Sequence, residues 1–281
     1  MITVRELSAL RERVRDARAQ GKTIGFVPTM GALHAGHLSL VRLARSESQF
    51  IVVSIFVNPL QFAPGEDFER YPRRHEEDAK MLEMEAADLL YLPDVERFYS
   101  KDFSTHVEVD AVSEGGEGAA RPGHFRGVAT VVAKLFLQVT PDVACLGRKD
   151  LQQVAVVRRM VRDLDFPVRL VIGETVRESD RLALSSRNAY LTQAQRKQAA
   201  LFPKALFAAQ AQARAGERSP SAIERATREA LAQAGFSIDY VDVVDPETMK
   251  RPAEIGATTA LAAAIRLGKT RLIDNVSLLE R

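Results

Sequence analysis

Two periods of apolar residues alternate along the first part of the chain, and each predicts a different kind of element. From Leu7 to Ala17 the apolar positions recur at helical spacing, and Gly21 ends the predicted helix. Residues 50–57 form instead a continuous apolar and β-branched run, typical of a strand that is covered on both faces. The same reasoning predicts strands at 23–27, 50–57, 89–92, 142–146 and 168–172, and helices at 5–19, from about 35, at 73–87, 125–139 and 150–163.

The alternation of strands and helices predicts a parallel sheet with helices on both faces. Beyond about residue 175 the pattern changes to helices rich in Ala, Gln and Arg at 192–214, interrupted by Pro203, and at 219–234. Strands are predicted there at 236–244, 258–266 and 270–278. We therefore expect an α/β fold, with a Rossmann-like doubly wound parallel-sheet domain at 1–175 and a smaller α+β domain at 176–281. Ligands of such sheets bind beyond the carboxyl ends of the strands, where the loops here are 28–37, 58–62, 145–150 and 176–187.

Composition and charge narrow the class of protein. Hydrophobic residues make up 46% and charged residues 27% of the 281 residues, as in an ordinary globular enzyme. The net charge of +2 argues against a nucleic-acid partner, and no run approaches the roughly 20 apolar residues of a membrane span. With no signal peptide recognised, we expect a soluble cytoplasmic protein. Cys145 lies in an apolar stretch and is expected to be a buried structural thiol.

A pair of histidines stands where the first of the ligand loops meets a predicted helix. His34 and His37 are three positions apart and share one face of the first turn, with Gly36 between them allowing a close backbone approach. A helix start favours phosphate, and imidazole N–H groups can stabilise charge on it. The alternative is an incidental pair of histidines. A zinc site is disfavoured because no third ligand has a suitable spacing.

Two further loops carry polar side chains with alternative explanations. Asn58 and Gln61 follow the apolar strand, and their amides suit a ligand with hydroxyls and a carboxylate, although Asn58 can instead cap the loop. The acidic residues 76–78 open a predicted helix, where they either compensate its dipole or hold magnesium through water and phosphate. The Gly-rich residues 113–119 are expected to form a loop, which is either a lid or a plain solvent loop.

The last two loops carry positive charge. Lys149 can place a compact charge on a phosphate, and Asp150 can bond a ribose hydroxyl or cap the following helix. Ser185 and Ser186 precede Arg187, whose guanidinium can grip phosphate oxygens in a fork.

These motifs carry a resemblance to a known family. His-Ala-Gly-His at 34–37 resembles the His-x-Gly-His signature of the nucleotidylyltransferase superfamily, which includes the class I aminoacyl-tRNA synthetases. Residues 28–34, 54–62, 121–132, 145–153 and 185–188 follow the order of the pantothenate synthetase (pantoate–β-alanine ligase) family, and the similarity extends to 268–275. The resemblance implies ATP-dependent condensation of pantoate with β-alanine through a pantoyl-adenylate, in pantothenate and coenzyme A biosynthesis. It also implies a homodimer and a need for Mg²⁺.

The resemblance further implies a set of site residues. Catalytic stabilisation of phosphate charge falls to His34, His37, Lys149 and Arg187. ATP is contacted by Met30, Gly31, Ala32, Leu33, His34, Ala35, Gly36, His37, Gly147, Arg148, Lys149, Asp150, Val176, Leu184, Ser185, Ser186 and Arg187. Pantoate is bound by Asn58, Gln61 and Gln153, β-alanine by Gln61, and the metal by Glu77 and Asp78, while Arg121 and His124 support bound substrate or pack the loop.

The chain departs from the family pattern at two positions. Arg148 replaces a usual glutamate, and Arg181 stands where the family usually has Asp-Gly before Leu-Ala. We expect the Arg148 side chain to face away from the phosphate site because Lys149 faces it.

Two rival functions remain. A plain adenylyltransferase leaves the carboxamides unexplained. A non-catalytic nucleotide-binding module would not need both histidines, Lys149 and Arg187.

Overall fold

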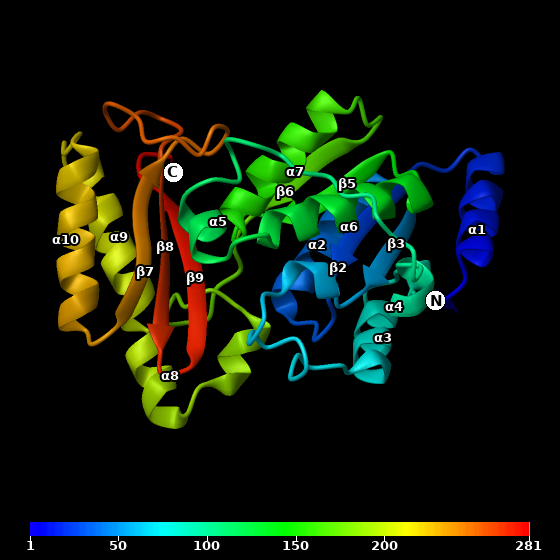
Figure 1. Ribbon diagram of the computed structural model, residues 1–281, viewed down its shortest axis with the longest axis horizontal. Coiled ribbons are helices and arrows are strands. Elements are labelled where there is room, and N and C mark those ends of the chain that lie inside the picture. The colour runs from blue at the N-terminus through cyan, green and yellow to red at the C-terminus, as the bar shows by residue number, and fades with distance from the viewer. Residues whose placement is uncertain (281) are drawn as a thin grey trace. The chain divides into compact units, whose positions relative to one another are not determined.

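The computed structural model describes residues 1–280, which fold into two compact units (Figure 1). The main division falls between Glu174 and Thr175, at the change in composition. Two short segments before that point also cluster with the C-terminal unit, which the sequence did not indicate. The first unit comprises Met1–Val109, Gly123–Arg148 and Val156–Glu174, and the second comprises Asp110–Pro122, Lys149–Ala155 and the chain from Thr175 onward.

A six-stranded sheet forms the centre of the first unit, in the order β1-β4-β3-β2-β5-β6. Every neighbouring pair is parallel, as predicted. The first strand was not predicted, because three residues are too few to show a period. The strands are β1 (Ile2–Val4), β2 (Ile24–Thr29), β3 (Phe50–Ile55), β4 (Leu89–Tyr91), β5 (Val143–Gly147) and β6 (Arg169–Gly173).

Helices cover both faces of this sheet. Right-handed crossovers place α1, α6 and α7, which lead the chain toward β6, on one face, and α2 and α3, which lead it toward β1, on the other. The doubly wound fold that the pattern predicted is therefore present. The helices are α1 (Leu7–Ala19), α2 (Ala35–Glu47), α3 (His75–Met84), the short α4 (Val95–Phe98), α6 (His124–Val139) and α7 (Leu151–Asp163).

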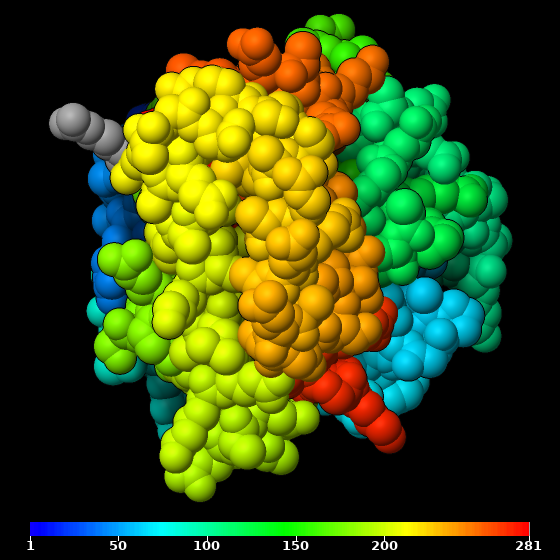
Figure 2. Space-filling view, turned by 90° about the vertical axis from the view of Figure 1, so that its left-hand side faces the viewer, coloured from blue at the N-terminus to red at the C-terminus, as the bar shows by residue number. Residues whose placement is uncertain are grey.

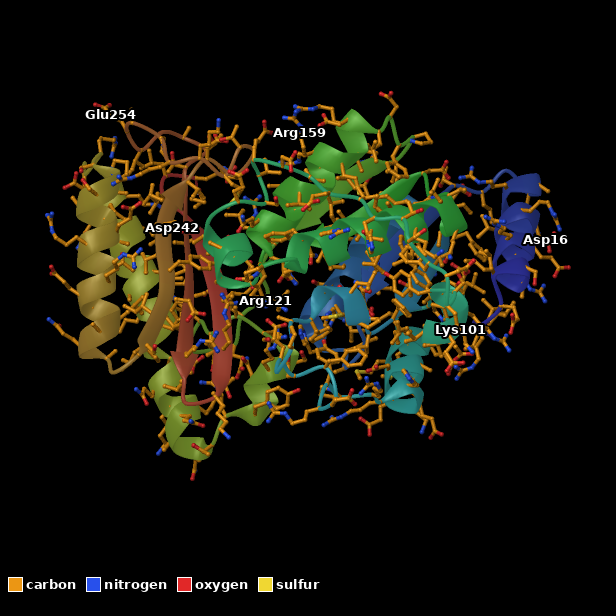
Figure 3. The ribbon with its side chains drawn as sticks, in the orientation of Figure 1. Asp16, Lys101, Arg121, Arg159, Asp242 and Glu254 are labelled. Atoms are coloured by element: carbon orange, nitrogen blue, oxygen red, sulfur yellow. The ribbon has the colours of Figure 1, made fainter. Side chains whose placement is uncertain are left out.

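The apolar spacing that predicted α1 is the spacing that the helix buries. Leu10, Val14 and Ala17 lie in the core, whereas Asp16 projects from the outer side of the helix (Figure 3). Burying a leucine completely, as at Leu10, contributes about 1.5–3 kcal/mol to stability. No helix within residues 1–280 is both long and apolar enough to cross a lipid bilayer.

The strand order reverses between β2 and β5. The chain passes from β2 to β3 on one side, while β5 and β6 lie on the other. Ligands of doubly wound sheets bind at such a reversal, beyond the carboxyl ends of the two strands. The loops that begin after Thr29 and at Gly147 lie at this point, as the sequence predicted.

The second unit is built on an antiparallel sheet of three strands, in the order β7-β8-β9. Helices α9 and α10 pack on it, with a core that includes Phe202, Leu206, Ile223 and Val241. In the space-filling view α10 lies beside β7 on the outer surface of the unit (Figure 2). The elements are α5 (Gly116–Ala120), α8 (Gln193–Ala199), α9 (Leu201–Arg214), α10 (Pro220–Gln233), β7 (Ser237–Val244), β8 (Ala260–Leu267) and β9 (Thr270–Ser277).

Two local expectations were wrong in this unit. The helical stretch 192–214 breaks at Ala200 rather than at Pro203, which lies in the first turn of α9. A proline fits there because an N–H in that turn has no intrahelical acceptor. The stretch 113–119 is not a plain solvent loop, because α5 begins at Gly116 and buries Glu117.

Candidate active site

Two histidine rings close the N-terminus of α2. His34 is the N-cap, and its Nδ1 accepts a hydrogen bond from the Gly36 amide at 3.2 Å. The Nδ1 of His37 accepts from the His34 amide at 3.3 Å, and the two ring centroids are 4.1 Å apart. A ring nitrogen that accepts carries no proton, so each neutral ring bears its N–H on Nε2. Capping thus gives both histidines a structural role, and their contact with phosphate stays a prediction.

The loop before this helix is held by a buried carboxylate. Asp78 is 0% exposed, and its two oxygens accept from the amides of Ala32 at 2.9 Å and Leu33 at 2.8 Å. Burial raises the pKa of Asp78, and the two amide donors oppose that rise. Gly31 has a φ of +84°, and an added Cβ there would lie 2.9 Å from Ile55. Glycine therefore fits this left-handed turn without strain and without a clash with Ile55.

The predicted metal pair, Glu77 and Asp78, does not fit a shared magnesium site. Asp78 is buried and bonds the loop through both oxygens, whereas the Glu77 side chain is largely exposed and lies 3.6 Å from Arg74. Adjacent helical positions point about 100° apart, so the two carboxylates do not converge. Within residues 1–280 no group of three or more His, Cys, Asp and Glu side chains could hold a metal ion.

The carboxamide loop after β3 is organised by Asn58, which caps the short helix η1 (Pro59–Gln61). The Asn58 side chain is 1% exposed and accepts from the Leu60 amide at 3.2 Å and the Tyr99 hydroxyl at 2.9 Å. Its Nδ2 donates to Gln61 Oε1 at 3.0 Å and to the Gly127 carbonyl at 3.1 Å. These bonds fill the capacity of the amide. Direct binding of pantoate by Asn58 therefore requires the exchange of one of them.

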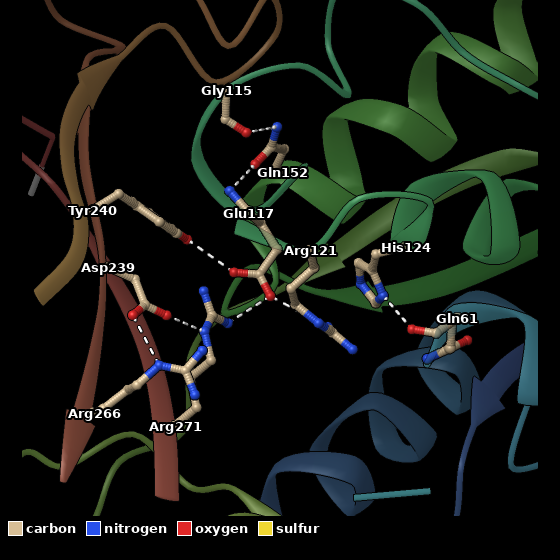
Figure 4. Close-up of polar contacts among 10 residues, drawn as sticks. All are labelled: Gln61, Gly115, Glu117, Arg121, His124, Gln152, Asp239, Tyr240, Arg266 and Arg271. Atoms are coloured by element: carbon tan, nitrogen blue, oxygen red, sulfur yellow. Dashed lines mark hydrogen bonds and ion pairs between the residues drawn. The ribbon is translucent and has the colours of Figure 1, made fainter. Parts of the chain in front are cut away.

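Gln61 links this loop to the histidine loop. Its Nε2 donates to the sulfur of Met30 at 3.0 Å, so residues predicted to bind pantoate and ATP meet here. His124, at the start of α6, donates from Nδ1 to the Gln61 carbonyl at 2.8 Å (Figure 4). His124 therefore fixes the loop backbone.

The sequence reading missed two residues that hold this loop. Tyr99 bonds Asn58, and a Cβ on Gly127 would lie 2.2 Å from the Leu60 carbonyl oxygen. Gly127 stands inside a strongly helical stretch, and a glycine in that position signals a close approach of another backbone. No sequence signal singled out Tyr99.

The loop after β5 carries the first departure from the family pattern. The Arg148 guanidinium lies 2.9 Å from Glu174, and its backbone amide donates to the Gly173 carbonyl. This partner gives the arginine a role at the end of β6.

Cys145 is fully buried in β5, as predicted, and burial raises the pKa of its thiol to about 12.

In the second unit, the chain from Val176 to Leu184 forms a hairpin. The Leu184 amide donates to the Val176 carbonyl at 3.0 Å, and Arg177 pairs with Ala183 as an antiparallel bridge. The tip residue Arg181 has a φ of +71°, a conformation that glycine adopts at less cost. The family resemblance predicts a glycine at this position, and such a residue would adopt this φ without strain. The Arg181 guanidinium lies 4.6 Å from the centroid of the Phe207 ring.

The predicted phosphate-binding turn follows this hairpin. The Ser185 hydroxyl accepts from the Arg187 amide at 3.2 Å and caps the short helix η2 (Ser186–Tyr190). Lys149 and Asp150 precede α7, and Gln153 is half-buried in its first turn. Gln153 and Gln61 belong to different units.

A buried carboxylate, Glu117, is the centre of a charge cluster in the second unit (Figure 4). Its Oε1 lies 2.7 Å from Arg271 and 3.3 Å from Arg121, and the Tyr240 hydroxyl donates to its Oε2 at 3.4 Å. Gln152 accepts from the Glu117 amide at 2.9 Å and donates to the carbonyls of Val112, Glu114 and Gly115. The segment that carries Arg121 is thus fixed to the C-terminal sheet.

Comparisons with known proteins point to one family. A family model described as pantoate-beta-alanine ligase matches residues 2–277. A pantothenate synthetase of Sphingopyxis alaskensis is 51% identical over 277 residues, which cover 98% of this chain and 99% of the relative.

Solved structures show the same similarity. The crystal structure of pantothenate synthetase from Thermus thermophilus superposes with a TM-score of 0.94 at 48% identity, covering 99% of this chain and 100% of that one. A Francisella tularensis pantoate-beta-alanine ligase, complexed with beta-gamma ATP and beta-alanine, has a TM-score of 0.82 at 31% identity and covers 99% of this chain and 98% of its own. This chain belongs to the pantoate–β-alanine ligase family.

Proposed function

We propose that the chain performs the reaction of its family, the ATP-dependent condensation of pantoate with β-alanine to pantothenate, in two steps. In the first, a pantoate carboxylate oxygen attacks the α-phosphorus of ATP, and pyrophosphate leaves as pantoyl-adenylate forms. In the second, the β-alanine amine attacks the acyl carbon, loses a proton, and displaces AMP. The observation that carries this proposal is the adjacent pair His34 and His37 at the start of α2, together with the Met30–Gln61 contact.

Positioning and charge stabilisation supply the rate in such a reaction, since the protein forms no covalent bond. In the first unit His34 and His37 donate from Nε2 to phosphate oxygens, at a helix start whose dipole favours the same charge. The backbone of residues 30–33, with the turn held by Asp78, contacts the nucleotide.

Pantoate lies against Gln61, whose amide is oriented by Asn58. Asn58 thus serves substrate binding mainly through Gln61. Gln61 also faces β-alanine, and this places the amine beside the acyl group that it attacks.

In the second unit, Lys149 and Arg187 supply positive charge to the phosphates. Asp150 bonds a ribose hydroxyl, while Val176 and Leu184–Ser186 line the nucleotide site. Gln153 contributes a second carboxamide to pantoate. We also propose that this unit closes over the nucleotide.

Magnesium enters, in our proposal, with ATP. Because Asp78 is committed to the loop amides, the ion has no carboxylate pair in α3. Mg²⁺ favours phosphate oxygens and retained waters, so it can neutralise triphosphate charge with few protein ligands.

A homodimer and a cytoplasmic location complete the proposal. Both follow from the family resemblance, and light scattering of the purified protein tests the first. A monomer across the micromolar range would contradict it.

The test of the reaction is exchange of labelled pyrophosphate into ATP without β-alanine. We expect exchange that requires pantoate, because the adenylate step is reversible. Full synthesis with no exchange would point to a concerted mechanism. Measurement of AMP with and without β-alanine separates this ligase from an adenylyltransferase and from a module that only binds nucleotide.

A further inference from the structure

A buried ion pair in the second unit joins β9 to the hairpin that precedes the Ser185–Arg187 turn. Asp274, on β9, has a side chain that is 1% exposed. Its Oδ2 and Oδ1 accept from the two terminal nitrogens of Arg177 at 2.7 and 2.9 Å, a bidentate fork. The Asn275 amide donates to the same carboxylate at 2.8 Å. This geometry fixes the guanidinium in one place.

The same guanidinium also bonds the hairpin in which Arg177 is the second residue. One terminal nitrogen also donates to the Arg181 carbonyl at the hairpin tip, at 3.0 Å, and the other donates to the Asn275 carbonyl at 3.0 Å. The base of the hairpin closes through the bond from Leu184 to Val176. Asp274 thereby sets, through Arg177, the position from which the chain enters the Ser185–Arg187 turn.

Asn275 reaches a second phosphate-binding segment. Its Nδ2 donates to the carbonyl oxygen of Lys149 at 2.9 Å, across 126 residues of sequence. The side chain of Asn275 is buried in β9, so the bond is partly shielded from water. Asp274 and Asn275, which are consecutive in β9, therefore bond both the Lys149 backbone and the hairpin that leads to Arg187.

We propose that Asp274 and Asn275 are positioning residues for the adenylation step. From adjacent positions on β9 they fix the distance between Lys149 and the Ser185–Arg187 turn. In this proposal neither residue contacts the nucleotide. The inference rests on the proposed roles of Lys149 and Arg187 in binding phosphate. The physical reason is that a charged donor stabilises the phosphate much less once it is displaced by about 1 Å.

The test is a double-mutant cycle between Asn275 and Lys149. Asn275→Ala removes the donor to the Lys149 carbonyl, and we expect kcat/KM for ATP in pyrophosphate exchange to fall about tenfold or more. In a Lys149→Ala background the same change should cost less than about twofold, because the charge that Asn275 positions is already gone. A purely structural role predicts the same fold loss in both backgrounds, and that result would overturn the proposal.

A matched control comes from Gln210, on α9. Its amide donates to the Ser277 carbonyl at 2.6 Å, two residues along the same strand from Asn275. Gln210→Ala thus removes the same kind of bond, and exchange should stay within about twofold of wild type. A loss as large as that of Asn275→Ala would show that any weakening of β9 suffices.

The ion pair is tested by exchanging both partners. Asp274→Asn alone can fail to fold, because it leaves a buried guanidinium poorly paired. The double variant Arg177→Met with Asp274→Leu replaces the pair by apolar groups and should keep thermal unfolding near that of wild type. We expect adenylation to stay at least tenfold reduced in this folded protein, and recovery of full exchange would contradict a positioning role.

The outcomes also separate this inference from the proposed reaction. If wild type gives no pantoate-dependent exchange, the reaction itself is wrong. If wild type exchanges and Lys149→Ala lowers that exchange to a level that can still be measured, while Asn275→Ala has no effect, only the positioning role is wrong.

Discussion

Single side chains near the site serve the fold and the chemistry with different atoms. Asn58 commits its whole amide to neighbours, whereas His37 commits Nδ1 to the helix cap and bears its proton on Nε2. Motif spacing identified both residues, but their division of labour depends on partners such as Tyr99, 41 positions from Asn58. Such partners come from folding of the chain, and a single sequence does not show them.

The two roles of His37 can be separated by substitution. His37→Ala should lower the adenylation rate by about 10²-fold or more, as expected for loss of a preorganised donor. His37→Asn keeps a side-chain oxygen that can accept from the His34 amide but does not carry the imidazole Nε2–H to the same place. It should restore thermal stability without restoring pyrophosphate exchange. Wild-type exchange in either folded variant would remove His37 from the chemistry.

Arg148 should matter little for ATP. Its guanidinium pairs with Glu174, and an exposed pair of this kind contributes less than about 1 kcal/mol. Arg148→Gln should therefore leave the KM for ATP within about threefold of wild type, at both low and high salt. A tenfold rise at low ionic strength that disappears with added salt would show that the arginine acts on the triphosphate.

Whole elements followed from the sequence wherever the apolar period ran long enough. The run at 50–57 predicted β3, and the stretch 125–139 predicted α6 to within a residue at its start. Short elements were missed, because three residues in β1 and five in α5 show no period. The loops at the strand ends were found because glycine, histidine and amide residues cluster there. The metal role of Asp78, by contrast, came from the family resemblance, and its bonds to the loop amides were not predicted.

The loop between β2 and α2 should depend on Asp78. Asp78→Asn replaces one acceptor by an amide N–H, which opposes the amide of Ala32 or Leu33. We expect a loss of about 1–3 kcal/mol in the free energy of unfolding, measured by urea titration, because a buried donor loses its partner. KM for ATP should rise as well.

The neighbouring carboxylate gives the control for this change. Glu77→Gln alters an exposed side chain, and both the unfolding free energy and the dependence of activity on Mg²⁺ should stay unchanged. A strongly raised Mg²⁺ requirement in Glu77→Gln would restore Glu77 as a metal ligand.

At the scale of the molecule, the second unit is assembled from separate parts of the chain. Glu117 and Arg271 are 154 residues apart, and Gln152 bonds the segment 112–117 from the start of α7. A composition change could locate the boundary near residue 175, but it could not show that 110–122 and 149–155 pack with the C-terminal sheet. Pairing over such distances depends on charge and shape together, and neither appears as a local pattern.

The charges of this unit form an alternating series, and its centre should be the sensitive point. Arg266 and Arg271 are cross-strand partners, which Asp239 bridges at 2.9 and 2.6 Å, and Glu117 continues the series toward Arg121.

Glu117→Gln removes the buried negative charge, with its side chain 8% exposed, and leaves Arg271 only Asp239. Removing one partner of a buried ion pair costs about 3–5 kcal/mol, so we expect a loss near the lower end of that range in urea unfolding. Arg266→Gln, at the half-exposed end of the series, should cost less than about 1 kcal/mol. Equal losses in the two variants would mean that the series acts as scattered surface pairs, and that Glu117 does not anchor residues 110–122 to the sheet.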